Sequence, residues 1–268
     1  MQTSERLKGK SSFSSAHCIC CSCVISFRQR SINGVLFVFS RFKALVIKQK
    51  RVVIICICVI LFVELLDDVL EGDLMTLDRL ARAFFVENLR SDWLTPFMES
   101  ASALATPLSL LVLLLVIVAF APGKRPGMFC ALNLVLVVLL NVVLKELVQR
   151  PRPEDINLVV ETGFSFPSGH SMVAMAFFGL LVWLVWHYEK DRTMRLACCG
   201  GFSLIILLIG ISRIYLGVHY ASDVLAGFCV SLAWLALYTS IAAPLFLQDS
   251  KESKEAKHLS PTEKQDSQ

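Results

Sequence analysis

Charged residues are scarce in this chain of 268 residues. Only 18% are Asp, Glu, Lys or Arg, whereas an ordinary soluble domain has about 25%. Hydrophobic residues make up 55%, and they collect in long runs without the period-2 alternation of outer-membrane barrel strands. The sequence therefore argues against a soluble enzyme, a disordered protein and an outer-membrane barrel. It predicts an all-α integral membrane protein.

The sequence also lacks a recognisable metal or disulfide framework. Six of its ten cysteines lie in or beside apolar runs, where cysteine behaves as a small hydrophobic residue: Cys56, Cys58, Cys130, Cys198, Cys199 and Cys229. The other four do not show the paired C-x2-C and histidine spacing of a structural zinc site; they are Cys18, Cys20, Cys21 and Cys23. We therefore expect no metal site, no cofactor and no disulfide framework.

Six apolar stretches dominate the chain. With their semi-polar ends, most of them approach the roughly 20 residues that a membrane-spanning helix needs. Only helices or closed barrels satisfy backbone polar groups in lipid, so the stretches predict a six-transmembrane-helix bundle over residues 52–247. The stretches are 52–66, 97–120, 128–148, 171–187, 196–211 and 224–247.

Positive charge is concentrated before the first stretch. Residues 1–51 contain ten Lys or Arg and a single acid, Glu5. Nucleic-acid binding is one interpretation of such a segment, but a basic cytoplasmic flank of a first membrane helix explains it better, and we expect no nucleic-acid partner. Residues 248–268 alternate Lys and Glu and are expected to form a polar cytoplasmic tail.

The loops predict how the protein lies in its membrane. Basic residues occupy the loops after the second and fourth stretches, whereas residues 67–96 hold seven acids against three Arg. By the positive-inside rule both termini face the cytoplasm of a plasma-membrane protein. The loops at 149–170 and 212–223 then share the extracytoplasmic side.

The first of three polar groups on that side lies in the run KELVQRPRP. Pro151 and Pro153 must end the third helix, because proline cannot donate a helical hydrogen bond. Lys145 and Arg152 therefore stand where a helix gives way to a loop. By itself, Lys145 is equally explained as a lysine that extends to the membrane interface.

The second group, Pro167-Ser168-Gly169-His170, precedes the fourth helix. Ser168 is a candidate N-cap, Gly169 permits close backbone approach, and His170 falls in the first turn. The unpaired N–H groups of a helix start suit a phosphate group. A capped helix with an interfacial histidine is the alternative.

The third group contains Ser212, Arg213, His219 and Asp223. If the last helix begins near Val218, His219 and Asp223 lie four residues apart on one helical face. A carboxylate bonded to one imidazole nitrogen fixes the tautomer and makes the other nitrogen a better nucleophile. An ordinary helical His–Asp pair is the alternative.

Together the three groups predict phosphoryl transfer. Lys145, Arg152 and Arg213 supply three cations, which suit a phosphate dianion and the added charge of its transition state. His170 and His219 supply a proton donor and a nucleophile. Because the sequence offers no acidic or histidine-rich metal cage, the cations would do what magnesium does elsewhere.

These residues resemble the tripartite signature of the type 2 phosphatidic acid phosphatase superfamily. The pattern is Lys145, six residues, Arg152-Pro153; then Pro167 to His170; then Ser212-Arg213, five residues, His219, three residues and Asp223, and all eleven positions match. The run GFSFPSGHSM is similar to the bacterial lipid-phosphatase branch. The resemblance implies a six-helix membrane fold with its active site at the extracytoplasmic face.

The resemblance also implies a role for each residue. His219 would attack phosphorus and form a phosphohistidine, Asp223 would orient His219, and His170 would protonate the leaving group and then activate water. The remaining signature residues would bind the phosphoryl oxygens: Lys145, Arg152, Ser168, Gly169 and Arg213.

Several functions share this chemistry. The implied enzyme hydrolyses phosphatidic acid, phosphatidylglycerol phosphate or undecaprenyl diphosphate, the last as an enzyme of wall-lipid recycling. A lipid phosphotransferase and a non-catalytic phospholipid-binding membrane protein are the alternatives. Vanadate-peroxidase relatives are soluble and therefore fit less well.

Overall fold

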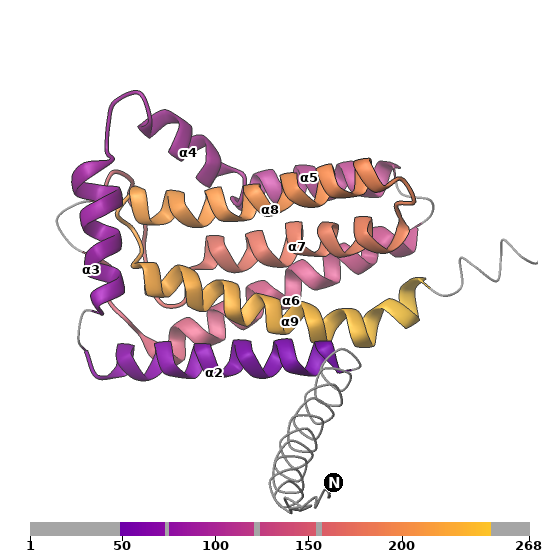
Figure 1. Cartoon of the computed structure of the whole chain (residues 1–268), viewed down its shortest axis with the longest axis horizontal. Helices are drawn as coiled ribbons and strands as arrows, with labels where there is room; N and C mark the ends of the chain where they lie inside the picture. The colour runs from indigo at the N-terminus through magenta and orange to yellow at the C-terminus, as the bar shows by residue number, and fades with distance from the viewer. Residues whose placement is uncertain (1–48, 73–74, 121–123, 154–156, 248–268) are drawn as a thin grey trace, which may run out of the picture. The chain divides into compact units, whose positions relative to one another are not determined.

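The structure is a computed structural model, and it describes residues 49–72, 75–120, 124–153 and 157–247. The predictions for the basic N-terminal segment and the polar tail fall almost entirely outside these residues. Within them every regular element is helical (Figure 1): α2 (Lys50–Leu70), α3 (Thr76–Arg82), the π-helix η1 (Ala83–Asn88), α4 (Thr95–Ala103), α5 (Pro107–Phe120), α6 (Lys124–Val148), α7 (Gly169–Tyr188), α8 (Arg192–Tyr215) and α9 (Ala221–Leu247). The predicted all-α class is confirmed.

Four helices in the described part of the chain, α6 to α9, are long and apolar enough to cross a membrane. The bent pair formed by α4 and α5 adds a fifth candidate. Large apolar side chains stay exposed on these helices, as contact with lipid requires, among them Leu108, Leu139, Leu207 and Ile241. The chain is a membrane-embedded protein.

The apolar stretch predicted at 97–120 is broken rather than continuous. The axes of α4 and α5 differ by 55°. Pro107 restarts the helix because it has no N–H for the preceding turn, and the backbone N–H of Ser109 donates to Thr106 Oγ1 over 3.5 Å, as in an N-cap. Hydropathy did not predict this break because the sequences of α4 and α5 are both apolar.

Helix α2 differs from the other long helices in its charge. Lys50 and Arg51 begin it, and Glu64, Asp67 and Asp68 occupy its last two turns. These charges exclude α2 from the helices that composition alone identifies as spans. The predicted count of six therefore stays a prediction.

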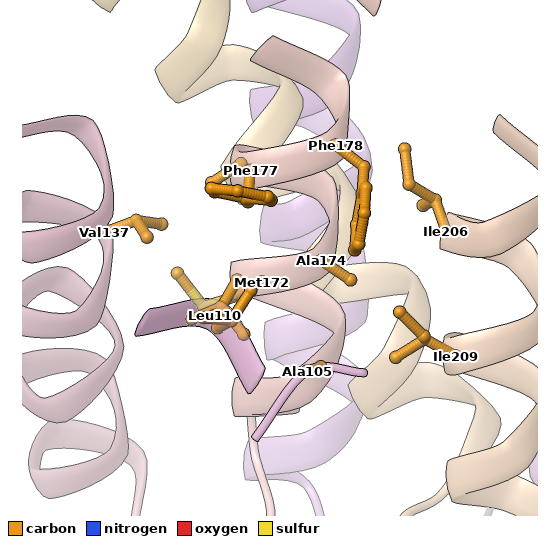
Figure 2. Packing of buried hydrophobic residues seen from close by; sticks show 11 residues of the cluster. Ala105, Leu110, Val137, Met172, Ala174, Phe177, Phe178, Ile206 and Ile209 are labelled. Carbon is orange, nitrogen blue, oxygen red and sulfur yellow. The ribbon is translucent and has the colours of Figure 1, made fainter. Parts of the chain in front are cut away.

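A shared apolar core joins the long helices, with α7 at its centre, packed against α6, α8 and α9. Figure 2 shows Phe177 and Phe178 of α7 among side chains from its neighbours, including Val137 and Ile209. At one end of the bundle, α6 and α8 finish and α7 and α9 begin (Figure 1). Helix α3 crosses this end of the bundle (Figure 1), where Asp78 accepts a hydrogen bond from the Ser222 backbone.

Candidate active site

His219 lies in the loop between α8 and α9. The sequence predicted it on a helix that would begin near Val218, but α9 begins at Ala221. Gly217 has φ +80°, and its N–H donates to Ile214 O over 3.0 Å. Glycine adopts this left-handed conformation without steric cost, so the chain turns sharply after α8 and carries His219 across the bundle end.

The contacts of His219 define its tautomer. Nε2 lies 3.2 Å from Arg152 Nη1, and a guanidinium can only donate, so Nε2 is an acceptor without a proton. The proton therefore lies on Nδ1, which donates to Asp223 Oδ2 over 3.3 Å. The lone pair of Nε2 consequently points to the side of the imidazole where the arginine lies.

Burial keeps this imidazole neutral. The His219 side chain is almost fully buried, and burial lowers its pKa from 6.5 to about 4, although the hydrogen bond and charge of Asp223 act in the opposite direction. A neutral imidazole has a lone pair available at physiological pH. His219 thus has the protonation state that a nucleophile needs.

Asp223 is fully buried and its two oxygens face different groups. Oδ2 accepts from the Tyr220 backbone N–H over 2.9 Å and also from Ser165 Oγ. Oδ1 accepts from Arg150 Nη1 over 2.6 Å. Sequence reasoning identified Asp223 but missed Arg150 and Ser165, although both lie in the runs that carry the signature.

Arg152 organises the loops as well as facing His219. Its guanidinium donates to Val218 O over 2.9 Å, Gly163 O over 3.0 Å and Thr162 O over 3.2 Å. Gln149, with φ +53°, and the prolines that follow it end α6 and lead the chain to this position. Arg152 therefore ties the segment after α6 to the loop before α9.

Arg213 is buried at the end of α8, with 2% of its surface exposed. Nη1 donates to Ser102 Oγ of α4, and Nη2 donates to a carboxylate oxygen of Glu161. Its Nε has no partner among the described residues. Glu161 also lies 3.8 Å from Arg152 Nη2, so this carboxylate, which the sequence did not single out, sits between two predicted phosphate-binding arginines.

Lys145 and His170 complete the charged group. Lys145 is half-buried in the last turn of α6, and its side chain makes no hydrogen bond to any described residue. His170 lies in the first turn of α7, as predicted, and interacts electrostatically with both Arg213 and His219. The structure thus brings both histidines and all three predicted cations to one end of the bundle.

Ser168 and Gly169 take part in packing at the start of α7. Ser168 is the N-cap residue, but its side chain makes no capping bond and instead accepts from Ser171 Oγ over 3.0 Å. A Cβ at Gly169 would lie 2.9 Å from Asn141 Oδ1. The close approach predicted at Gly169 is therefore, in this structure, an approach to α6.

The described residues contain no group of three or more His, Cys, Asp or Glu side chains that is arranged to hold a metal ion. The six cysteines they include are all free.

Comparison with known proteins identifies the family. Residues 126–246 match the model of the PAP2 superfamily. Phosphatidylglycerophosphatase B of Bacillus subtilis is 39% identical over 151 residues, which cover 54% of this chain and 73% of that protein. The chain belongs to the PAP2 superfamily.

Other relatives of this PAP2 protein agree with that assignment. Lipid A 1-phosphatase of Rhizobium etli is 34% identical over 113 residues, which cover 38% of this chain and 44% of the relative. The crystal structure of a transmembrane PAP2 type phosphatidylglycerolphosphate phosphatase from Bacillus subtilis superposes with a TM-score of 0.59 at 30% identity, over 75% of this chain and 96% of that one. LpxE of Aquifex aeolicus gives a TM-score of 0.50 at 28% identity, over 62% and 96% of the two chains.

Proposed function

We propose that this PAP2 protein is a membrane lipid phosphatase that removes the terminal phosphate of a lipid phosphate or diphosphate through a phosphohistidine. The observation that carries the proposal is the orientation of His219. Its Nδ1 proton faces Asp223, and its Nε2 lone pair faces the Arg152 guanidinium.

In the first step, His219 Nε2 attacks phosphorus and the bond from phosphorus to the leaving oxygen breaks. His170, which is protonated when the phosphate dianion is bound beside it, gives its proton to the leaving oxygen, and Asp223 stabilises the positive charge on the His219 ring. In the second step, water attacks the phosphohistidine, His170 takes a proton from the water, and the P–N bond breaks. Phosphate leaves, and both histidines return to their starting protonation states.

The predicted phosphate ligands have complementary roles in this reaction. Arg213 Nε and Lys145 Nζ are free of hydrogen bonds to described residues, so both can donate to phosphoryl oxygens. Donors fixed before the reaction stabilise the charge that develops in the transition state. Ser168 and Gly169 would contribute at the start of α7, where the helix end favours an anion.

An apolar cavity between α2, α6 and α9 is a suitable path for the lipid tail. Phe62 lines it, and the Phe62 ring lies 5.7 Å from the ring of Phe166, two residues before Ser168. A tail in this cavity would thus end beside the phosphate-binding segment. The other lining residues are Ile55, Cys58, Val59, Leu140, Cys229, Val230, Ala233, Trp234 and Leu237.

The proposal includes the membrane arrangement. Helix α2 would be the first of six spans, with its charged ends at the two interfaces, and the bent α4–α5 pair would be the second. The positive-inside rule supports cytoplasmic termini and an outward-facing site. Residues 1–51 and 248–268 would then flank the catalytic domain, 52–247, on the cytoplasmic side.

Phosphatidylglycerol phosphate is the first substrate to test, because relatives that match this chain carry the name phosphatidylglycerophosphatase B. Phosphatidic acid and undecaprenyl diphosphate present the same terminal phosphoryl group and are the comparison substrates. Phosphate release by the detergent-purified protein would be measured with all three lipids in the presence of EDTA, with His219→Ala as control.

Release that persists in EDTA and is lost in His219→Ala is the expected result. Loss of wild-type release in EDTA would overturn metal independence. Absence of release from every lipid, with the protein shown to be folded, would favour the phosphotransferase or the lipid-binding alternative.

A further inference from the structure

We infer that Arg150 and Asp78 are positioning residues that hold the Asp223–His219 pair in its reactive arrangement and set the pH range in which it works. The inference rests on the proposed function, since it concerns how His219 is made nucleophilic. Neither residue belongs to the three-part signature. Arg150 precedes Arg152 by two residues, and Asp78 comes from α3, far away in the sequence.

Arg150 joins two carboxylates in the interior. Nη1 donates to Asp223 Oδ1 over 2.6 Å, and Nη2 donates to Asp78 Oδ2 over 3.0 Å. Arg150 is 8% exposed and Asp78 3%. Buried charged groups are retained only when they are paired and hydrogen-bonded, so the three side chains form one interdependent unit.

Ser222 closes this unit and connects it to the start of α9. Its backbone N–H donates to Asp78 Oδ1 and its Oγ donates to Asp78 Oδ2, each over 2.8 Å. Arg150 Nη1 also donates to Ser222 Oγ over 2.7 Å. Helix α3 is thereby attached to the residue next to Asp223.

The arrangement decides which oxygen of Asp223 faces the histidine. Arg150 occupies Oδ1, so His219 Nδ1 meets Oδ2. The guanidinium lies 4.0 Å from the centre of the Tyr220 ring, which fixes its plane beside the residue that follows His219. A planar two-armed group is required here, because a lysine cannot bridge two carboxylates in this manner.

The charges predict opposite effects for the two residues. Removing the Arg150 cation makes it easier to protonate the His219–Asp223 pair. Removing the Asp78 anion makes that protonation harder. Other charged or titratable groups that face the pair stay in place in both variants: Arg82 from α3, Lys145 from α6, Arg152 and Glu161 from the following loop, His170 from α7, Arg213 from α8 and Tyr220 beside His219.

The test measures the pH dependence of kcat/KM for Arg150→Met and Asp78→Asn with one lipid substrate. His219 must be neutral to attack, so kcat/KM falls on the acidic side of its pH profile as His219 becomes protonated. This acidic limb should move to higher pH in Arg150→Met and to lower pH in Asp78→Asn. We expect kcat to fall about 10–100-fold in Arg150→Met, the loss typical for removal of an outer partner of a metal-ligating histidine. Arg79→Met is the matched control, since Arg79 is exposed on α3 beside Asp78.

A buried carboxylate left without its arginine destabilises a protein, so Arg150→Met alone can unfold it. The double variant Arg150→Met/Asp78→Asn removes one charge of each sign and keeps the balance. It should fold, remain slow and show a smaller upward shift of the acidic limb than Arg150→Met, because Arg150 contacts Asp223 directly and Asp78 does not. Asp78→Asn, which preserves shape, gives the independent test of the downward shift.

Two outcomes would overturn the inference. One is a folded double variant with the kcat and the acidic limb of the wild type. The other is a shift of the same sign in Arg150→Met and Asp78→Asn, which would indicate general damage to the fold. Failure of the proposed function gives a different result, because the wild type would then form no phosphohistidine.

Discussion

A carboxylate oxygen of Glu161 accepts a hydrogen bond from Arg213 Nη2. Its other oxygen lies 3.8 Å from Arg152 Nη2. Burial alone would raise the pKa of Glu161, but the Arg213 guanidinium and the other nearby positive groups lower it, so the carboxylate is ionised at neutral pH. Glu161 therefore interacts with the guanidinium groups of two arginines, Arg213 and Arg152, that the proposed reaction needs for binding the phosphoryl group.

Glu161→Gln should bind inorganic phosphate more tightly. The amide keeps the size of the side chain but removes the negative charge that competes with phosphate for Arg213. We expect the inhibition constant of phosphate to fall several-fold. The measurement is competitive inhibition of lipid hydrolysis, with Glu146→Gln, an exposed site on α6, as control. Unchanged or weaker inhibition would show that Glu161 does not compete with phosphate.

His219 should stay neutral at a pH where ordinary histidines are already protonated. Its pKa is lowered by burial to about 4, against about 6.5 for an unperturbed imidazole. The chain has five histidines, so nitrogen-15 spectra of histidine-labelled protein are tractable, and His219→Gln identifies the signal. As pH falls, the signal should keep the neutral form through 6.5 and titrate near 4. A midpoint near 6.5 would contradict this assignment.

His170→Ala should accumulate the phosphoenzyme with substrates that still transfer their phosphoryl group to His219 in the absence of the proton donor. The variant lacks the group that activates water, so the second step is slowed for every substrate, and the phosphoenzyme should accumulate most with substrates whose leaving group needs little help from a proton donor. Rapid quenching with phosphorus-32-labelled lipid diphosphate would detect acid-labile label on the protein. His170→Ala/His219→Ala should carry none, and equal labelling of both variants would exclude His219 as the acceptor.

Lys145→Ala should lower kcat/KM by about 10²–10³-fold, comparable to loss of one oxyanion donor. The Lys145 ammonium is half-buried and has no hydrogen bond to a described residue. Its removal therefore does not leave another buried polar group unpaired. Thermal unfolding should therefore change little. A kcat/KM equal to that of the wild type would remove Lys145 from the site and favour its role as an interfacial lysine.

Gly169→Ala should destabilise the protein by about 1–3 kcal/mol, the usual cost of overpacking. The added Cβ would lie 2.9 Å from Asn141 Oδ1, and Asn141 is held by a hydrogen bond of 3.2 Å from Nδ2 to Pro167 O. Thermal unfolding in detergent would measure the loss. The variant Gly169→Ala/Asn141→Ala should recover the part due to the clash, and no recovery would indicate that another contact is responsible.

The residues of the candidate site were largely predictable. Lys145, Arg152 and Arg213 are cations at the ends of apolar helices, where charge is costly without a purpose, and the order of the apolar stretches predicted that they would meet at one end of the bundle. The glutamate and the arginine that pair with them were not predictable in this way. Glu161 and Arg150 are ordinary charged loop residues until the fold shows their partners.

Helix limits show the same division. Pro151 and Pro153 predicted the end of α6, and Ser168 predicted the start of α7, because helix-ending prolines and N-cap residues act within one turn of the chain. The break between α4 and α5 and the position of His219 before α9 depend on turns inside or beside apolar sequence, where periodicity carries no signal.

Hydropathy and local spacing are properties of neighbouring residues, so they were enough to predict the helical membrane class and the three groups of residues that resemble the PAP2 signature. The contact of Arg150 with Asp78, 72 positions away, and its contact with Asp223, 73 positions away, became visible in the folded protein alone. The physical reason is that a buried charge selects its partner by distance in space, and that distance exists only after the helices have packed.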